Sequence, residues 1–204
     1  MTTKHAPNEN FNVSHYYSRE LDEHLNVLTQ TQKEMLEPFS QWVDMCYESI
    51  LSGGKILFFG NGGSAADAQH LATELTVRFK DNRPAIPALA LTTDTSTLTA
   101  IGNDLGFEAL FERQIEAMAD PRDVVVAITT SGKSPNIIRG IKKANESGVK
   151  TVGLTGKGGG DLHSICNLLL IVPSDTTARI QEMHITLGQM LCGALEQKLG
   201  YVDG

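Results

Sequence analysis

The sequence contains few cysteines, and their spacing suggests no pairing. Its three cysteines, Cys46, Cys166 and Cys192, are odd in number and form no C-x-x-C pair. This pattern argues against both a disulfide framework and a cysteine zinc site. We therefore expect reduced thiols that are buried in the core.

Long hydrophobic runs are also missing. The longest are ILFF, VVVAI and LLLIV, whereas a transmembrane helix needs about 20 apolar residues. The first residues, MTTKHAPNENFN, lack the apolar stretch of a secretion signal. We therefore expect no membrane partner and a cytoplasmic protein.

Positive charge is scarce relative to negative charge. The 204 residues include 17 Lys and Arg against 24 Asp and Glu, which gives a net charge of -7. A nucleic-acid surface requires clustered Lys and Arg, so no nucleic-acid partner is expected. The hydrophobic share of 41% is ordinary for a globular protein and is enough for one substantial core.

The chain is predicted to consist of a short polar lead-in and one domain. Residues 1–14 are polar and are predicted to be a flexible lead-in, followed by a single domain over residues 15–204. From Tyr16 to Leu51, apolar residues recur at helical spacing, which predicts a helical N-terminal section with a break near Pro38. The SGG sequence that follows is expected to end this section.

Beyond this section, short apolar runs alternate with helical stretches. The runs are KILFFG, PALALT, DVVVAIT, KTVGLTG and NLLLIV. Continuous apolar character is typical of parallel strands that are covered on both faces. The sequence therefore predicts an α/β fold with a doubly wound parallel sheet flanked by helices and a helical N-terminal extension. Ligands bind beyond the carboxyl ends of such strands, which indicates four loops: GNGGS, TTDTST, TTSGKSP and TGKGGG.

The first of these loops is rich in glycine. Gly60, Gly62 and Gly63 separate a strand from a helix, with Ser64 at the expected N-cap position. Glycines allow close backbone approach, and a helix N-terminus offers free N–H groups, so the loop suits a phosphate or the polar end of a sugar. It matches neither the Walker loop nor the dinucleotide fingerprint. Taken alone, it also fits a tight strand-to-helix connection without a ligand.

The third loop is rich in hydroxyl groups. It offers Thr129, Thr130, Ser131 and Ser134, followed by Pro135 at a favoured first position of a helix. Hydroxyl and amide donors together can surround a phosphate monoester without a metal ion or an arginine. A well-capped helix start would explain Ser134, but it would leave the other three hydroxyls without a role.

These two loops, together with RIQEMH at 179–184, resemble the sugar isomerase (SIS) domain family and, within it, the bacterial phosphoheptose isomerases. The resemblance runs from about residue 15 to residue 199. It includes the segments NRP, TTDTS and AIGNDLGFE. So many matching segments in the same order make it a specific resemblance.

The resemblance implies a five-stranded parallel sheet of the SIS fold and a homotetramer with active sites at subunit interfaces. It also implies isomerisation of sedoheptulose 7-phosphate to D-glycero-D-manno-heptose 7-phosphate, a precursor of surface polysaccharides. The implied phosphate contacts are Thr129, Thr130, Ser131 and Ser134. The other implied substrate contacts are Asn61, Gly62, Gly63, Ser64, Glu74, Asn103, Asp104 and Gln181.

Conversion of a ketose to an aldose moves a proton between adjacent carbons, so it needs a base beside one carbon. The resemblance implies that Glu74 is this base. It also implies one zinc ion per subunit, held by His70, Glu74, Gln181 and the residue at position 189. His70 and Glu74 are four residues apart and face the same way on a helix, which suits two ligands of one ion. An isolated pair of this kind also occurs on many exposed helix faces.

Gln189 departs from the family pattern, which has a catalytic and metal-binding histidine at that position. A neutral amide carries no proton and is a poor zinc donor. Moreover, Gln181 and Gln189 are eight residues apart, a rise of about 12 Å in a helix. Three interpretations are open: Glu74 acts alone with water or substrate hydroxyls as relays, His184 substitutes after a local shift, or isomerase activity is lost. We favour the first, and a buried hydrogen-bonded histidine is an equally good account of His184.

A different class of function competes with the isomerase. A non-catalytic SIS protein would act by protein contact, like the replication-initiator-associating type, or as a sugar-phosphate sensor. The retained Glu74 and the intact phosphate loop favour the enzyme, whereas Gln189 argues the other way. The sequence leaves the length of the sugar, the metal, the product anomer and the pathway open.

Overall fold

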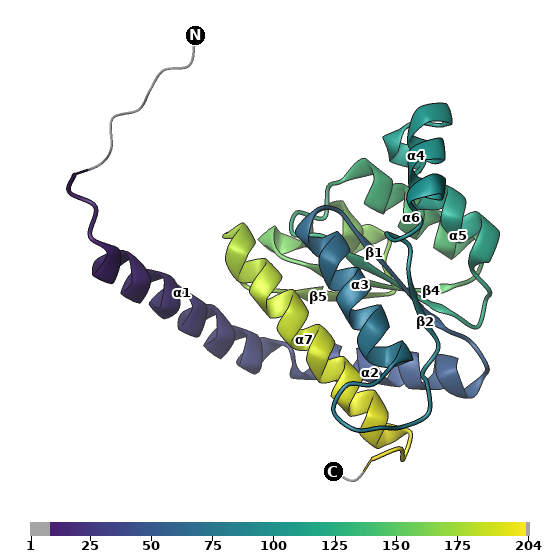
Figure 1. Ribbon diagram of the computed structural model, residues 1–204, viewed down its shortest axis with the longest axis horizontal. Coiled ribbons are helices and arrows are strands. Elements are labelled where there is room, and N and C mark those ends of the chain that lie inside the picture. Colours follow the sequence, from purple (N-terminus) through teal and green to yellow (C-terminus); the bar gives the residue numbers. More distant parts are fainter. Residues whose placement is uncertain (1–8, 203–204) are drawn as a thin grey trace.

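Five parallel strands form the centre of the computed structural model, which describes residues 9–202. They are β1 (Ile56–Gly60), β2 (Ala88–Ala90), β3 (Val124–Ile128), β4 (Lys150–Thr155) and β5 (Leu168–Ile171). Their spatial order is β2-β1-β3-β4-β5, with every neighbouring pair parallel (Figure 1). All five predicted strands are therefore confirmed.

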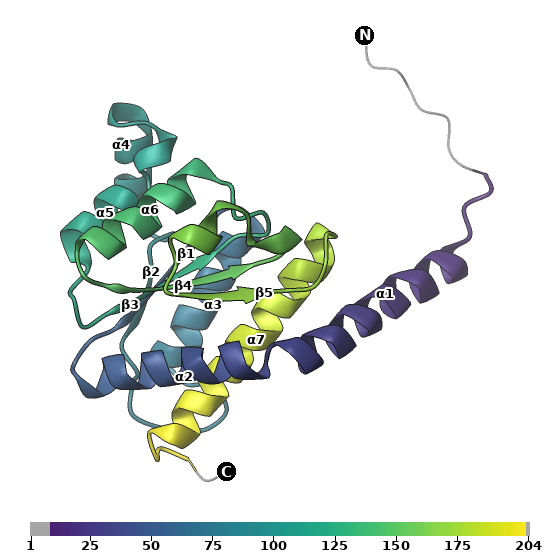
Figure 2. The same ribbon diagram turned by 180° about the vertical axis from the view of Figure 1, so that it is seen from behind.

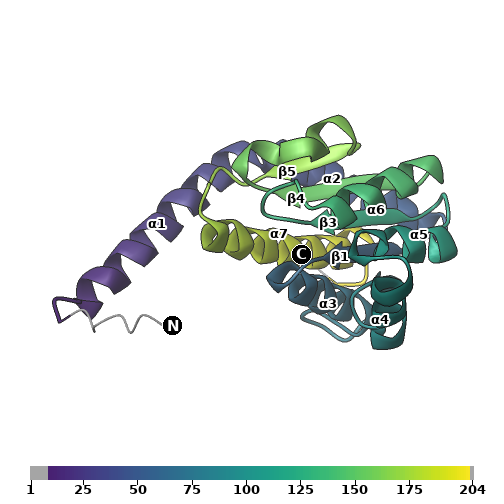
Figure 3. The same cartoon turned by 90° about the horizontal axis from the view of Figure 1, so that it is seen from above.

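Helices cover both faces of this sheet. They are α1 (Val13–Glu34), α2 (Leu36–Leu51), α3 (Gly63–Thr76), α4 (Thr95–Asp104), α5 (Glu112–Met118), α6 (Pro135–Glu146) and α7 (Thr177–Lys198), with short 3-10 helices η1 (Phe107–Ala109) and η2 (Lys157–Ser164). Ile56 and Phe58 of β1 face α2, α3 and α7, whereas Leu57 and Phe59 face α5 and α6 (Figure 3). This arrangement confirms the doubly wound α/β fold. No helix within residues 9–202 is long and apolar enough to cross a bilayer.

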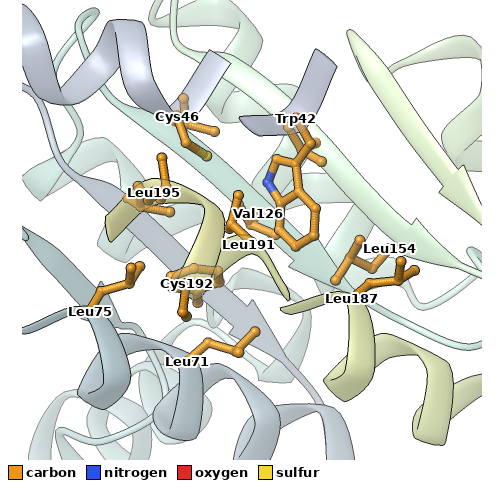
Figure 4. Packing of buried hydrophobic residues seen from close by; sticks show 14 of the residues in the cluster. Trp42, Cys46, Leu71, Leu75, Val126, Leu154, Leu187, Leu191, Cys192 and Leu195 are labelled. Carbon is orange, nitrogen blue, oxygen red and sulfur yellow. The ribbon is translucent and has the colours of Figure 1, made fainter. Parts of the chain in front are cut away.

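The larger part of the core lies between the sheet and three helices. Trp42 from α2, Leu71 from α3 and Leu191 from α7 are all fully buried and point into this layer (Figure 4). Cys46 and Cys192 are buried in it as free thiols, as the sequence predicts. Burial raises the pKa of the Cys192 thiol to about 12. Cys166, by contrast, is only partly buried.

The N-terminal section differs in detail from the prediction. The break lies at Met35, between α1 and α2, and not at Pro38. Pro38 is in the first turn of α2, where a backbone N–H has no acceptor within the helix, so a proline is tolerated. The helix α1 begins at Val13, inside the predicted lead-in, and residues 1–8 lie outside the described range. It extends away from the body of the domain (Figure 2).

The strand order contains a switch point beside β1. The chain passes from β1 to β2 on one side and then to β3 on the other. In the register of this pair, Gly60 lies opposite Ile128, so β1 and β3 end at the same level. Ligands of doubly wound folds bind at such a point, outside the carboxyl ends of the strands. The loops after β1 and β3 therefore start side by side.

Close packing of α3 against α7 gives a test of this architecture. An ideal Cβ on Gly188 would lie 2.5 Å from a methyl carbon of Leu71. We expect Gly188→Ala to lower the free energy of unfolding by about 1–3 kcal/mol, because an overpacked core must shift. Gly102→Ala is the matched control, since no atom of the described residues lies within 4 Å of its added Cβ. That variant should be about 0.5–1 kcal/mol more stable than the wild type. Urea unfolding curves measure both values, and equal effects would contradict the packing.

Candidate active site

The glycine loop leads from β1 directly into α3. Gly62, with a φ of 57°, is the N-cap residue, and α3 begins at Gly63. Ser64 is therefore not the N-cap, as predicted, but the second residue of the helix, where it is buried. The left-handed turn at Gly62 explains the difference, because it lets the Asn61 carbonyl accept the Ser64 N–H and the Gly62 carbonyl accept that of Ala65.

A pair of amide side chains ties the two loops together. Asn61 Nδ2 donates to Asn136 Oδ1 at 2.9 Å, and Asn136 Nδ2 donates to Asn61 Oδ1 at 2.8 Å. Asn136 is buried in the first turn of α6, directly after the hydroxyl-rich loop. The sequence analysis missed Asn136, and its place after SGKSP was the available signal. The pair fixes the N-termini of α3 and α6 relative to each other.

The hydroxyl-rich loop leads from β3 into α6. Pro135 is the first residue of the helix, as predicted, and Ser134 is its N-cap. In the described chain, the Ser134 side chain makes no capping hydrogen bond. The Ser131 hydroxyl accepts the Lys133 N–H at 3.2 Å, while Thr129 is buried at the base of the loop. Capping of α6 therefore does not explain the Ser134 hydroxyl, and this hydroxyl remains available to a ligand.

The loop after β4 packs against the hydroxyl-rich loop through backbone alone. The Asp161 N–H donates to the Gly132 carbonyl at 3.1 Å. An ideal Cβ on Gly160 would lie 2.4 Å from the Ser131 carbonyl oxygen, and one on Gly132 would lie 2.1 Å from that of Gly159. The glycines of TGKGGG therefore support the hydroxyl-rich loop from behind. This support is a role that the sequence did not reveal.

The last two turns of α3 bring His70 and Glu74 together with Gln189 of α7. His70 Nε2 lies 3.0 Å from Glu74 Oε1, and Gln189 Nε2 of α7 lies 3.5 Å from the same histidine nitrogen. This close contact involves only one of the two carboxylate oxygens of Glu74. The Glu74 side chain is 23% exposed, so a small ligand can reach it.

Gln181 lies apart from this group. Its amide nitrogen is 2.5 Å from the position that a Cβ on Gly63 would occupy, which places Gln181 beside the first loop. Gln181 and Gln189 belong to one uninterrupted helix, so about 12 Å of helix axis separates them. Gln181 therefore lies beside the first turn of α3, whereas Gln189 lies beside the turn that contains His70.

These residues do not fit a zinc ion. Zinc prefers thiolate, imidazole and carboxylate ligands, and this set offers one imidazole, one carboxylate and two amides. His70 Nε2 and Glu74 Oε1 also lie 3.0 Å from each other. Within residues 9–202, no group of three or more His, Cys, Asp or Glu side chains could hold a metal ion. The zinc site implied by the resemblance stays a prediction, and no step below depends on it.

His184 lies beneath the site rather than in it. Its side chain is fully buried, and its Nε2 donates to the Thr155 carbonyl at 3.2 Å. Among the described residues, its Nδ1 has no partner. Burial lowers the pKa of His184 to about 4, so the imidazole is neutral at physiological pH. The packing interpretation accounts for the burial and for the bond to Thr155, and no atom of the side chain is open to a substrate.

Asn103 and Asp104 lie at the exposed end of α4. Asn103 Nδ2 donates to Asp104 Oδ1 at 2.6 Å. The helix α4 follows β2, the edge strand, and projects from the body of the domain (Figure 1). The role of this pair in sugar binding stays a prediction.

The glycine support of the phosphate loop can be tested directly. We expect Gly160→Ala to weaken phosphate binding about tenfold or more, because one lost hydrogen bond to a charged group costs about 1.5–3 kcal/mol. Gly158→Ala is a control for an alanine at a positive φ, of 72°, in the same loop, and no atom of the described chain lies within 4 Å of its Cβ. Isothermal titration with inorganic phosphate measures both affinities. Equal losses in the two variants would assign the effect to backbone strain alone.

Comparison with known proteins agrees with this geometry. The profile of the SIS domain family matches residues 17–156. A phosphoheptose isomerase from Paramagnetospirillum magneticum is 52% identical over 181 residues, which are 89% of this chain and 94% of that protein. The structure of phosphoheptose isomerase GmhA from Neisseria gonorrhoeae superposes with a TM-score of 0.87 at 40% identity, covering 91% of this chain and all of that one. A phosphoheptose isomerase structure from Francisella tularensis gives a TM-score of 0.89 at 34% identity, covering 92% of this chain and all of the other. The chain therefore belongs to the SIS domain family, among the phosphoheptose isomerases.

Proposed function

We propose that this protein is an aldose-ketose isomerase that converts sedoheptulose 7-phosphate to D-glycero-D-manno-heptose 7-phosphate, for surface-polysaccharide precursors. One observation carries the proposal: the carboxylate of Glu74, oriented by His70 at 3.0 Å, stands on the helix that starts at the phosphate-type loop. The relatives at 52% and 40% identity bear the name of this activity.

The phosphate of the substrate would bind between two helix N-termini. The helices α3 and α6 both begin at the switch point, and free N–H groups at such ends favour an anion. The hydroxyls of Ser131 and Ser134 add donors on one side. This site recognises the phosphate by hydrogen bonds and helix dipoles, without an arginine.

The chemistry needs one base that faces two adjacent carbons. Glu74 takes a proton from carbon 1 of the ketose, and the carbonyl oxygen at carbon 2 gains a proton to give an enediol. Protonated Glu74 then returns its proton to carbon 2, while the hydroxyl at carbon 1 loses its proton and becomes the aldehyde. Water or the substrate hydroxyls relay the protons between the oxygens. The contact with His70, 3.0 Å from Glu74 Oε1, restricts the orientation of the Glu74 carboxylate through both transfers.

Gln189 supports this chemistry without exchanging protons. Its amide lies beside His70, at 3.5 Å, and its N–H groups can donate to the oxygen that gains negative charge on the way to the enediol. Gln181 lies near the glycine loop and is suited to a sugar hydroxyl. Both amides therefore act as hydrogen-bonding groups in the proposed reaction.

Assembly into a homotetramer belongs to the same proposal, as does a cytoplasmic location, where sugar phosphates are held by their charge. The helix α1 projects from the body and exposes a series of large apolar side chains (Figure 2). They are Val13, Tyr16, Tyr17, Leu21, Leu25 and Leu28. An exposed apolar surface of this kind marks an interface, and further copies of this chain are the proposed partners.

Conversion of sedoheptulose 7-phosphate by chelator-treated protein tests the function, with NMR detection of both sugars and with zinc added back. Turnover without zinc would support the proposed reaction. Turnover that requires zinc would show that the metal prediction is right and that the proposed chemistry is incomplete. Saturable binding without turnover would instead make the protein a sugar-phosphate-binding member of the family.

Glu74→Gln should lower kcat at least about 100-fold, because general-base catalysis contributes about 10²–10⁴-fold. The amide is isosteric, so binding of the substrate should be nearly unchanged. NMR assays give kcat, and calorimetry gives the affinity. Undiminished turnover in this variant would remove Glu74 from the mechanism.

Substitution of Leu21→Lys together with Leu25→Lys should dissociate the assembly, because buried lysines at an interface are costly. The two leucines are 50% and 60% exposed in the single chain, so the fold of the subunit should persist. Asp22→Lys with Asn26→Lys places lysines at the neighbouring helix positions as a control. Sedimentation velocity measures the mass, and an unchanged tetramer in the leucine variant would exclude this face from the interface.

A further inference from the structure

A buried arginine contacts the end of the helix that carries Glu74. Arg83 lies in the loop between α3 and β2, and its side chain is fully buried. Its Nη2 donates to the backbone carbonyl of Glu74 at 2.7 Å, and its Nη1 donates to that of Leu75. A second bond from Nη1 reaches the Pro84 carbonyl at 3.0 Å. One planar guanidinium thus joins the helix end to its own loop.

These contacts satisfy groups that a helix cannot satisfy by itself. The last four carbonyls of a helix have no N–H partner within it, and α3 ends at Thr76. Glu74 and Leu75 contribute two of these carbonyls. A cation at this end also interacts favourably with the helix dipole. The guanidinium geometry suits the task, because its donors point in fixed and divergent directions.

Glu196 of α7 holds the arginine in place. Its Oε1 accepts from Arg83 Nε at 2.8 Å and from the Phe79 N–H at 3.0 Å. Its side chain is only 2% exposed. A buried ion pair is a weak source of net stability, and apolar residues of similar size are often as good or better. Net stability therefore does not explain this buried ion pair, and we expect it to have another role.

We propose that Arg83, held by Glu196, is a positioning residue for Glu74. This inference rests on the proposed function, in which Glu74 is the base. Glu74 is only two residues from the end of α3, where helices tend to fray. The bond to its own carbonyl holds the backbone from which the Glu74 side chain projects, at the point where fraying would move it. The same arginine then links the base to α7, which carries Gln181 and Gln189.

Arg83→Lys tests the positioning role. A lysine keeps the charge but cannot reach two carbonyls and a carboxylate in one plane. We expect kcat to fall by about 100-fold, the effect of a displacement of about 1 Å at a catalytic group, with little change in KM. A rise in KM without a change in kcat would overturn the proposal.

The matched control breaks another charge pair with a buried carboxylate, whose hydrogen bonds go to Lys55 and Asp120 and not to α3. Lys55 Nζ lies 2.6 Å from Asp123 Oδ2, at the amino-terminal ends of β1 and β3. Asp123→Asn should lower the Tm and leave kcat unchanged. If kcat instead falls in both variants in proportion to the loss in Tm, Arg83 acts through stability alone, and the proposal is wrong.

A charge-free variant separates positioning from folding. In Arg83→Met with Glu196→Gln, no buried charge is left unpaired, and the amide oxygen introduced at position 196 can still accept the Phe79 N–H. We expect a Tm near that of the wild type and a kcat as low as in Arg83→Lys. If both the Tm and kcat of this variant are near those of the wild type, the proposal is wrong.

Amide hydrogen exchange keeps the inference testable without turnover. Arg83→Lys should speed exchange in the last turn of α3, around residues 74–77, and leave α6 unchanged. If the wild type does not isomerise sedoheptulose 7-phosphate, the proposed function fails, and exchange alone decides whether Arg83 fixes this turn. Unchanged exchange there would overturn the proposal whatever the activity.

Discussion

The site depends on one constraint of the sheet, which is that β1 and β3 are neighbours and end at the same level. Gly60 pairs with Ile128 in the last step of their register. Because the chain moves outward in opposite directions from this pair, the space beyond it is left for a ligand. The helices α3 and α6 both start there, and the Asn61 and Asn136 amides lock the two starts together.

The helix α7 forms the second wall of the site. It runs alongside α3 in the same direction, so successive turns of the two helices meet in order. Gln181 meets Gly63, Gly188 meets Leu71, and Gln189 meets His70. The apolar contacts of this interface thereby fix the places of the polar groups beside Glu74. Gln189 fits this helix packing, but it places a neutral amide beside His70 where the family pattern has a histidine.

Two buried ion pairs lie at the ends of elements. Arg83 and Glu196 lie at the end of α3, and Lys55 with Asp123 lies at the start of β1 and β3. Such groups are costly to remove from water. Each pair also binds backbone groups that regular structure leaves unpaired, such as the Lys55 N–H on Asp123 Oδ1. These ion pairs therefore help to fix where a helix or strand ends and how the adjoining loop is held.

The sequence by itself determined the five strands, the two buried faces, the places of the glycine-rich and hydroxyl-rich loops, and the shared face of His70 and Glu74. Each of these follows from local periodicity or from the residues of a single turn. The tertiary structure decided the rest: the strand order, the break at Met35, the N-cap at Gly62 and the burial of His184. It also showed the support of one loop by the glycines of another. The physical reason is that periodicity tells which side of an element is buried, whereas the partner on that side is set by packing between segments far apart in the chain.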